Sequence, residues 1–432
     1  MNGQKSVCVI GGGVAGLSAA VFLAKENFKI TLVEASPKLG GRAYSFFDKQ
    51  LGIIIDNGQH IFASWYKDTF EFLKIIGSYD KLKFQKRLEV NFRDLNGKSY
   101  TLKSPFNFFF GMITYDALSF KDNMCLIRFL RKIKSGKLRD IDLRNINTDE
   151  LFVETEQTVN LIKSFWEPFI VAVFNAEPKD TSALMFVEMI NHGFIEKGNS
   201  NLVLPNDFLS DIYVEPTVNY LRKKDANVIL NKQASSFKFK DDKITSLILE
   251  DKSEIESDIY VSAVPFFDLE KLLGNEFVSK LETSSITNIH IKFSESIDEI
   301  IKERFVGILD ATIQWVFKVK DDQICVVISA SNEIAEKDKE EIFEIAKREL
   351  TNSFQEIKNK TIDGYRVIKE MRATFKPNKD SLNNRLDNKT AYNNFFLAGD
   401  WTNTGLPSTI EGAVRSSKKC VNLITNNFQI IN

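Results

Sequence analysis

Residues 7–34 read VCVIGGGVAGLSAAVFLAKENFKITLVE. The apolar run at 7–10 predicts a strand, the small and apolar residues at 15–24 predict a helix, and the run at 30–33 predicts a second strand. Glycines separate the first strand from the helix. Two strands joined through a helix form a βαβ unit, which is typical of a parallel sheet in an α/β protein.

Three glycines in this stretch have the GxGxxG spacing. Gly11 allows a tight turn, Gly13 lets the backbone approach a pyrophosphate, and Gly16 lets the helix pack closely on the strand. The helix N-terminus then faces the phosphates with its free N–H groups. Glu34 ends the second strand, where a carboxylate can accept hydrogen bonds from both ribose hydroxyls. A glycine turn without a ligand is the alternative, but the two strands, the helix and the acid together favour a dinucleotide site.

A second glycine pair distinguishes FAD from NAD. The sequence LGGRA at 39–43 follows the second strand within ten residues. Two glycines and Arg42 at this place can surround the far side of a pyrophosphate and extend toward a flavin, which an NAD-only domain does not need. We therefore expect FAD. The predicted contacts in this half of the chain are Gly11, Gly13, Ala15, Gly16, Glu34, Ala35, Gly40, Gly41 and Arg42.

The other end of the chain predicts a matching half-site. A buried strand pattern at 395–398 runs into Gly399 and Asp400, and a threonine opens a helix pattern at 409–423. We expect Asp400 to hold the ribityl chain and the N–H groups after Thr409 to stabilise negative charge on the reduced ring. A strand and helix that merely close the domain are the alternative. The predicted contacts here are Gly399, Asp400, Thr409, Ile410 and Glu411.

Composition excludes several other classes of protein. The 432 residues predict two or three domains, and 43% apolar residues exclude disorder. A net charge of −1 argues against a nucleic-acid partner. Four cysteines without CxxC spacing and three scattered histidines support neither a disulfide framework nor a metal site. The stretch at 7–24 is a poor membrane span because glycines interrupt it. We expect a cytoplasmic protein, bound peripherally to the inner face of the cytoplasmic membrane.

Several segments resemble the flavin-containing amine oxidase and phytoene desaturase superfamily. They are VIGGGVAGLSAAVFLA, LVEASPKLGGRAYSF, DNGQHIF and LAGDWTNTGLPSTIEGAVRSS. Within it, the chain looks most like the squalene-associated branch, hydroxysqualene dehydroxylase. Four interior segments also resemble that branch and occur in the same order along the chain: FWEPFIVAVFNAEPKDTSA, LVLPNDFLSDIYVEP, VSAVPFFDL and IQWVF. The chain is richer in lysine and phenylalanine than is usual in this branch.

The resemblance implies a discontinuous Rossmann-like FAD-binding domain with an inserted α+β substrate-binding domain. We expect the FAD-binding domain at 1–65, 225–286 and 390–432, and the substrate domain with its helical insert at 66–224 and 287–389. Helical patterns after Trp65 and strand patterns from Val228 agree with this division. By position, Ala234 would give backbone contacts to adenine.

The resemblance also implies a reaction, in which hydroxysqualene loses its hydroxyl, gains a hydride from reduced FAD and becomes squalene. In the segment GIIIDNGQHIF at 52–62, Gly58 lets the backbone approach the ring, and Gln59 and His60 are predicted to line the reacting face. Loss of hydroxide needs a proton donor in an apolar cavity. The alternatives are that His60 only bonds its loop and that Glu167 only pairs within helices. The candidate donors are His60, Glu167, Glu177 and Glu411.

A polyisoprenoid substrate lies in the bilayer, so an enzyme that acts on it needs a surface that meets the membrane, such as an interfacial helix. Apolar residues at 126–133 alternate with cations at 128–139, and several phenylalanines precede them. This pattern predicts a helix on an anionic membrane surface, and a core-packed helix with a solvated basic face is the alternative. The apolar residues are Phe106, Phe108, Phe109, Phe110, Leu126, Ile127, Phe129, Leu130 and Ile133. The cations are Arg128, Arg131, Lys132, Lys134, Lys137 and Arg139.

Three other functions stay open. A carotenoid-type desaturase would use the same fold in the oxidative direction. A small-amine oxidase would need an aromatic cage beside the flavin; Trp401 and Phe396 are near the right place, but the phenylalanine-rich insert suits a hydrocarbon better. A lipid-binding escort protein without redox chemistry is disfavoured by the intact glycine motif and Gly399-Asp400. The reductant that would reduce the flavin is not identified by the sequence.

Overall fold

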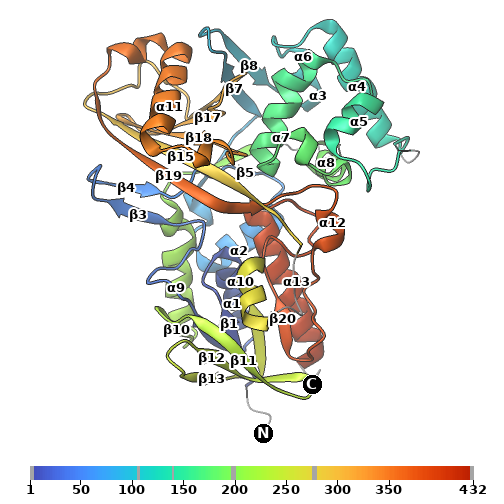
Figure 1. Ribbon diagram of the computed structural model, residues 1–432, viewed down its shortest axis with the longest axis vertical. Helices are drawn as coiled ribbons and strands as arrows, with labels where there is room; N and C mark the ends of the chain where they lie inside the picture. The colour runs from blue at the N-terminus through green and yellow to red at the C-terminus, as the bar shows by residue number, and fades with distance from the viewer. Residues whose placement is uncertain (1–3, 105–107, 139–140, 196–200, 275–279, 429–432) are drawn as a thin grey trace.

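The computed structural model describes residues 4–104, 108–138, 141–195, 201–274 and 280–428. The side chains of residues 108–110 and 194 are outside this description. The chain forms a lower part around a parallel sheet and an upper part around a mostly antiparallel sheet with a group of helices at its side (Figure 1).

The lower part is built on a five-stranded parallel sheet. Its order is β10 (Asn227–Ile229), β2 (Lys29–Val33), β1 (Ser6–Ile10), β14 (Ile259–Ser262) and β20 (Phe395–Leu397). All four pairings are parallel. The strands read as continuous apolar runs because helices cover a parallel sheet. This sheet confirms the predicted α/β class with a Rossmann-like core, and it joins segments from both ends and the middle of the chain.

Helices and a small sheet surround these strands. Helix α1 (Val14–Lys25) packs against α13 (Ile410–Phe428), and both bury apolar faces. Helices α2 (Lys67–Ile76), α9 (Glu215–Arg222) and α10 (Phe266–Leu273) complete the cover. An antiparallel sheet adds β11 (Ala234–Lys240), β12 (Lys243–Leu249) and β13 (Glu254–Glu256).

The upper part is built on a seven-stranded sheet. Its order is β19 (Ile362–Phe375), β15 (Thr283–Phe293), β18 (Gln323–Ile328), β17 (Trp315–Lys320), β16 (Phe305–Ile308), β7 (Glu89–Arg93) and β8 (Ser99–Lys103). Only the β16–β7 pairing is parallel among these strands. Helix α11 (Lys339–Ser353) packs on this sheet.

Short elements link the two parts. A hairpin pairs β3 (Ser45–Asp48) with β4 (Ile53–Asp56). A three-stranded sheet contains β5 (Phe62–Ala63), β9 (Leu202–Pro205) and β6 (Leu82–Phe84). Helix α12 (Ser381–Asn384) precedes β20.

The helices beside the upper sheet share an aromatic core. They are α3 (Phe108–Ile113), α4 (Phe120–Lys134), α5 (Thr148–Glu154), α6 (Val159–Leu161), α7 (Glu167–Phe174) and α8 (Ala183–Ile190). Trp166 is fully buried, with the rings of Phe129, Phe152 and Phe186 within 6.0 Å, centroid to centroid. Much of the phenylalanine excess therefore packs inside the protein.

Helix α4 corrects the predicted membrane face. Leu126, Phe129, Leu130 and Ile133 are at most 8% exposed and belong to the core. The prediction that this face enters a bilayer is wrong, because the helical period identifies an apolar face without saying what covers it. Phe106 and Arg139 lie outside the described residues, as do the side chains of Phe108, Phe109 and Phe110.

Candidate active site

The turn after β1 is the first part of the site. Gly11 has a φ of +100°, and a Cβ on Gly16 would lie 1.8 Å from the carbonyl oxygen of Gly11, so the close packing of α1 requires glycine there. Gly13 is different. A Cβ on Gly13 would meet nothing nearer than the Cα of Gly41, at 3.8 Å. The protein alone does not require glycine at this position, and the space beside Gly13 is open to a ligand.

A second glycine loop lies against this turn. The backbone N–H of Gly40 donates to the carbonyl of Gly12 at 2.8 Å, and Gly13 forms an isolated β-bridge with Gly40. The N-cap of α1 is Gly13, which brings no side-chain acceptor. Helix α1 thus begins without the side chain that usually satisfies its first N–H groups, as expected for a phosphate site.

Glu34 closes the other side of the turn. Its carboxylate accepts from the N–H groups of Gly12 at 2.6 Å and Ser36 at 2.7 Å. A carboxylate has about four acceptor positions, so two are left for ribose hydroxyls. Ala35 is exposed beside it. Ala234 opens β11, directly after a segment whose Lys232 N–H donates to the carbonyl of Glu34.

The two ends of the chain meet at an ion pair. Arg42 Nη2 lies 2.5 Å from Asp400 Oδ1, and Arg42 Nη1 donates to the carbonyl of Ala373. Ser408 donates its hydroxyl to the other carboxylate oxygen of Asp400. Burial would lower the pKa of Arg42, but the Asp400 carboxylate outweighs it and the pKa is raised. The arginine therefore stays charged, and its bond to Asp400 ties the glycine loop to the turn after β20.

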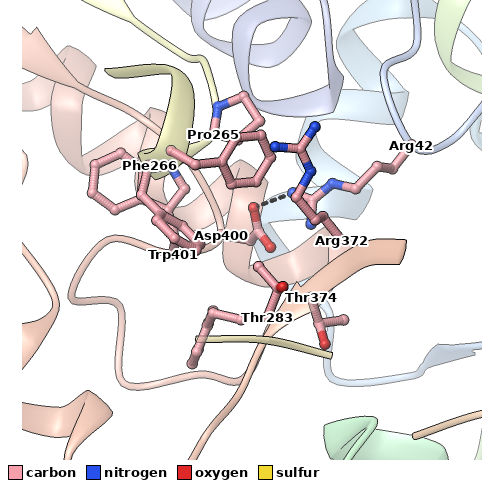
Figure 2. A pocket seen from close by; sticks show the side chains of 10 residues that line it. Arg42, Pro265, Phe266, Thr283, Arg372, Thr374, Asp400 and Trp401 are labelled. Carbon is pink, nitrogen blue, oxygen red and sulfur yellow. Dashed lines mark hydrogen bonds and ion pairs between the residues drawn. The ribbon is translucent and has the colours of Figure 1, made fainter. Parts of the chain in front are cut away.

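A small hollow adjoins this pair. Figure 2 shows Arg42 and Asp400 on one side of it, Phe266 and Trp401 on another, and Arg372 nearby. The Arg42 side chain is 39% exposed, yet burial is the leading influence on its pKa. The open face at Gly13 and this arginine fit the pyrophosphate and ribityl parts of FAD.

We expect Arg42→Met to lower the free energy of unfolding of the apoprotein by about 2–3 kcal/mol, because it leaves the Asp400 carboxylate buried without its cation. Arg42→Met with Asp400→Asn should cost less than the two single variants added together. A double-mutant cycle by chemical denaturation measures this difference. Additive effects would show that the ion pair does not couple the chain ends.

The loop after β4 carries the predicted reacting-face residues. Asn288 on β15 donates its amide to the carbonyl of Asn57 at 3.1 Å, and a Cβ on Gly58 would lie 3.4 Å from that amide. The buried atoms Asn57 Oδ1 and Gln59 Nε2 have no hydrogen-bond partner in the described structure. Unpaired buried polar atoms are costly, so a donor and an acceptor here indicate a place for a polar group of a ligand.

His60 is not suited to be the proton donor. Its Nδ1 lies 3.2 Å from the carbonyl oxygen of Gly58, which can only accept, so Nδ1 carries the hydrogen. Burial lowers the pKa of His60, the bond to Gly58 raises it, and the charge of Arg42 lowers it again, with a lower pKa as the net result. A neutral ring at pH 7 leaves Nε2 as an acceptor.

Glu411 does not have the role predicted for it as a proton donor. Its carboxylate is fully buried and accepts from the N–H groups of Asp68 and Thr69 and the hydroxyl of Thr69, so it caps the start of α2. Arg415 lies 3.3 Å away. This carboxylate is committed to α2 and is not a proton donor. Burial raises its pKa, and the bonds from Thr69 lower it, with a raised pKa as the net result.

The neighbouring residues Thr409 and Ile410 form the start of α13, and their contact with the flavin stays a prediction. Thr409 Oγ1 accepts from the N–H of Gly412 at 3.0 Å and so caps this helix. Ile410 is half-buried and packs in the core beneath the parallel sheet. Gly399 donates its N–H to Ser416, which fixes the turn that carries Asp400.

The two remaining acids differ in their surroundings. Burial raises the pKa of Glu167, with Glu177 and Asp310 adding to the rise and Lys163 opposing it. Glu177 lies at the surface, 49% exposed, and pairs with Lys179 at 2.6 Å. Glu167 is therefore the one of the four candidates whose carboxyl is half-buried with a raised pKa and is not committed to a helix cap.

Two supporting residues had no signal in the sequence. Arg385 is buried and donates to the backbone carbonyls of Asp400 at 3.0 Å and Leu406 at 2.8 Å, which shapes the turn after β20. Burial lowers its pKa to about 10. Asn288 holds the loop after β4 from the upper sheet. Neither residue belongs to a motif, and their roles follow only from contacts distant in sequence.

Asp56 gives a pH-dependent prediction. It accepts from Ser45 Oγ at 2.6 Å and Leu209 N at 3.0 Å, while burial raises its pKa to about 6. Because the pKa of Asp56 is higher in the folded than in the unfolded protein, its protonated carboxyl contributes stability below about pH 4. This contribution is lost as the pH rises through about 6. Asp56→Asn keeps an acceptor for Ser45 and removes the charge.

We therefore expect Asp56→Asn to stabilise the protein by about 2 kcal/mol near pH 7.5 and to bring no gain near pH 4. Denaturant unfolding of wild type and variant at both pH values measures the difference. An equal effect at the two pH values would contradict the raised pKa.

This arrangement of two glycine loops and an acid on a parallel sheet is typical of FAD-binding oxidoreductases. Residues 14–425 match the model of the flavin containing amine oxidoreductase family. The chain belongs to this family and is an FAD-dependent oxidoreductase.

Named relatives match over nearly the whole length. The chain is 28% identical to the hydroxysqualene dehydroxylase of Zymomonas mobilis, over 96% of this chain and 98% of that protein. It is 22% identical to the chloroplastic 15-cis-phytoene desaturase of an Oncidium hybrid cultivar, over 98% and 78% respectively. Among solved structures, cyclohexylamine oxidase from Brevibacterium oxydans has a TM-score of 0.74 at 14% identity, covering 99% of this chain and 100% of that one. This last likeness concerns the fold alone.

Proposed function

We propose that the protein reduces hydroxysqualene to squalene by removing its hydroxyl group. The observation that carries the proposal is the full-length similarity to three bacterial proteins named hydroxysqualene dehydroxylase, at 26–28% identity and at least 96% of this chain. The unpaired polar atoms at Asn57 and Gln59 support it, because a polyisoprenoid alcohol offers one hydroxyl to bind.

The reaction balances as one hydride and one proton delivered to a carbon–oxygen bond. The C–O bond breaks, the hydroxyl leaves as water with the added proton, and the new C–H bond uses the hydride. Reduced FAD, when bound, supplies the hydride and is itself oxidised. A separate reductant, a partner of unidentified class, must then restore the reduced flavin.

The chain's residues bind, orient and protonate. Gly13, Gly41, Arg42, Glu34 and Asp400 hold FAD in this proposal. Gln59 Nε2 donates to the substrate oxygen, and the neutral His60 ring accepts from the same hydroxyl and orients it. For the proton that turns the leaving group into water, Glu167 is the remaining candidate: burial raises its pKa, and the role requires that the substrate hydroxyl reach the start of α7.

An anaerobic single turnover tests the function. The photoreduced holoenzyme is mixed with hydroxysqualene, and we expect flavin absorbance to return in proportion to the squalene formed. Unchanged flavin absorbance and unchanged substrate would refute the proposal.

A carotenoid-type desaturase is the second candidate, favoured by the similarity to phytoene desaturases over 98% of this chain. It predicts the opposite direction of chemistry. Oxidised enzyme would then bleach on mixing with phytoene or squalene and form a product with an additional double bond. The same spectrophotometer and product extraction distinguish the two candidates.

A further inference from the structure

The outward side of α4 exposes large apolar side chains at its beginning. Phe120 is 82% exposed and Met124, one turn later, is 42% exposed. Ile113, at the end of α3, is 54% exposed, and Val159, at the start of α6, is 71% exposed. Exposing large apolar side chains to water is unfavourable, and a group of them on a surface marks an interaction site.

These four residues belong to one corner of the molecule. Helix α3 packs against α4. Asp122, in the first turn of α4, accepts from Thr158 Oγ1 and from Asn160 Nδ2 at 2.7 Å, which ties the start of α6 to the start of α4. Figure 1 shows α3, α4 and α6 at the outer end of the helical group, far from the parallel sheet.

Cations continue the same side of α4. Arg128 and Arg131 follow Met124 at helical spacing and are exposed, whereas the core face points the opposite way. Residues 108–138 contain six cations and two acids, in a chain of net charge −1. One of these acids, Asp122, is buried. We call this region the α4 surface. It consists of Ile113, Phe120, Lys121, Met124, Arg128, Arg131, Lys132, Lys134, Lys137 and Val159.

We propose that the α4 surface docks on an anionic lipid bilayer, with Phe120 and Met124 in the acyl boundary and the cations against the headgroups. An apolar tip followed by cations is the arrangement that an interfacial helix needs. Lysine is depleted at protein–protein interfaces, so a lysine-rich border favours lipid over a protein partner. The inference deepens the proposed function, since a polyisoprenoid substrate would be collected from the bilayer.

Vesicle flotation of the FAD-loaded protein tests the proposal. We expect binding to phosphatidylcholine vesicles that contain phosphatidylglycerol and much weaker binding to phosphatidylcholine alone. Arg131→Glu with Lys134→Glu should weaken binding to the anionic vesicles at least about a hundredfold. Lys223→Glu with Lys224→Glu, an exposed pair after α9, is the matched control and should bind as wild type.

A second pair of variants tests the apolar tip. Phe120→Ser with Met124→Ser should weaken binding more than about tenfold, as expected from burial of two large side chains. Phe239→Ser with Met371→Ser changes residues that are 45% and 50% exposed elsewhere and should have no effect. Unchanged binding by both α4 variants would overturn the proposal. So would a dimer in size-exclusion chromatography that the Phe120 variant dissociates, because a second copy would then be the occupant.

Turnover of detergent-solubilised hydroxysqualene separates this inference from the proposed function. We expect the α4 variants to retain wild-type rates in detergent and to lose rate only with substrate in vesicles. If no squalene forms under any condition while the vesicle binding follows the pattern above, the proposed function fails and the docking inference stands. Wild-type vesicle rates in all variants would overturn the docking inference alone.

Discussion

Gly13→Val is expected to abolish FAD binding and leave the apoprotein folded. A Cβ at Gly13 meets no protein atom nearer than 3.8 Å, and the φ of −72° suits any residue, so the backbone and the first side-chain atom of the variant fit the apoprotein. The same side chain fills the space that a pyrophosphate needs against the backbone. The purified variant should be colourless, with the circular dichroism and denaturation midpoint of the wild-type apoprotein.

Gly16→Ala is the contrasting variant. Its Cβ would lie 1.8 Å from the carbonyl oxygen of Gly11, so α1 must move away from the turn whether or not FAD is present. We expect it to destabilise the apoprotein itself. If Gly13→Val binds flavin as the wild type does, the glycine turn is not the pyrophosphate site. Loss of fold in both variants would assign Gly13 a purely structural role.

Glu167→Gln is expected to slow loss of the hydroxyl group by about a hundredfold or more, with little change in flavin binding. The carboxamide has nearly the shape of the acid but no proton to give. Single-turnover reoxidation of the reduced enzyme by hydroxysqualene measures this step directly. Because burial and Glu177 raise the pKa of Glu167, the wild-type rate should also fall as pH rises through that pKa.

Glu177→Gln is the matched control, since Glu177 is exposed and paired with Lys179. It should retain turnover close to wild type, apart from a small effect through the pKa of Glu167. An unchanged rate in Glu167→Gln would contradict the assignment and leave Glu167 as a residue of the helical group only.

Local patterns carried most of what the sequence could predict. The glycine turn, α1 and Glu34 lie within 24 residues, from Gly11 to Glu34, and their roles depend on backbone geometry that such spacing determines. The strand before Gly399 and the helix that starts at Ile410 were readable for the same reason. The two predicted halves of the FAD site come together because β1 and β20 belong to the same parallel sheet.

Partners distant in sequence explain what the sequence did not predict. Glu411 stands in the right motif, but its carboxylate binds the start of α2, 342 residues away. The period of α4 predicted a helix correctly and could not tell which face the aromatic core would cover. Arg385 belongs to no sequence motif. Its guanidinium donates to backbone carbonyls of a turn that takes its shape only on folding, so no local pattern could reveal its role.

The ion pair between Arg42 and Asp400 joins residues 358 positions apart, and β20 enters the parallel sheet from the last tenth of the chain. During synthesis, the ribosome therefore releases the glycine turn long before its counterpart exists. Cofactor capture must then wait until the turn that carries Asp400 has been synthesised, and until that moment the nascent N-terminal part exposes an unfinished sheet edge that chaperones would have to shield.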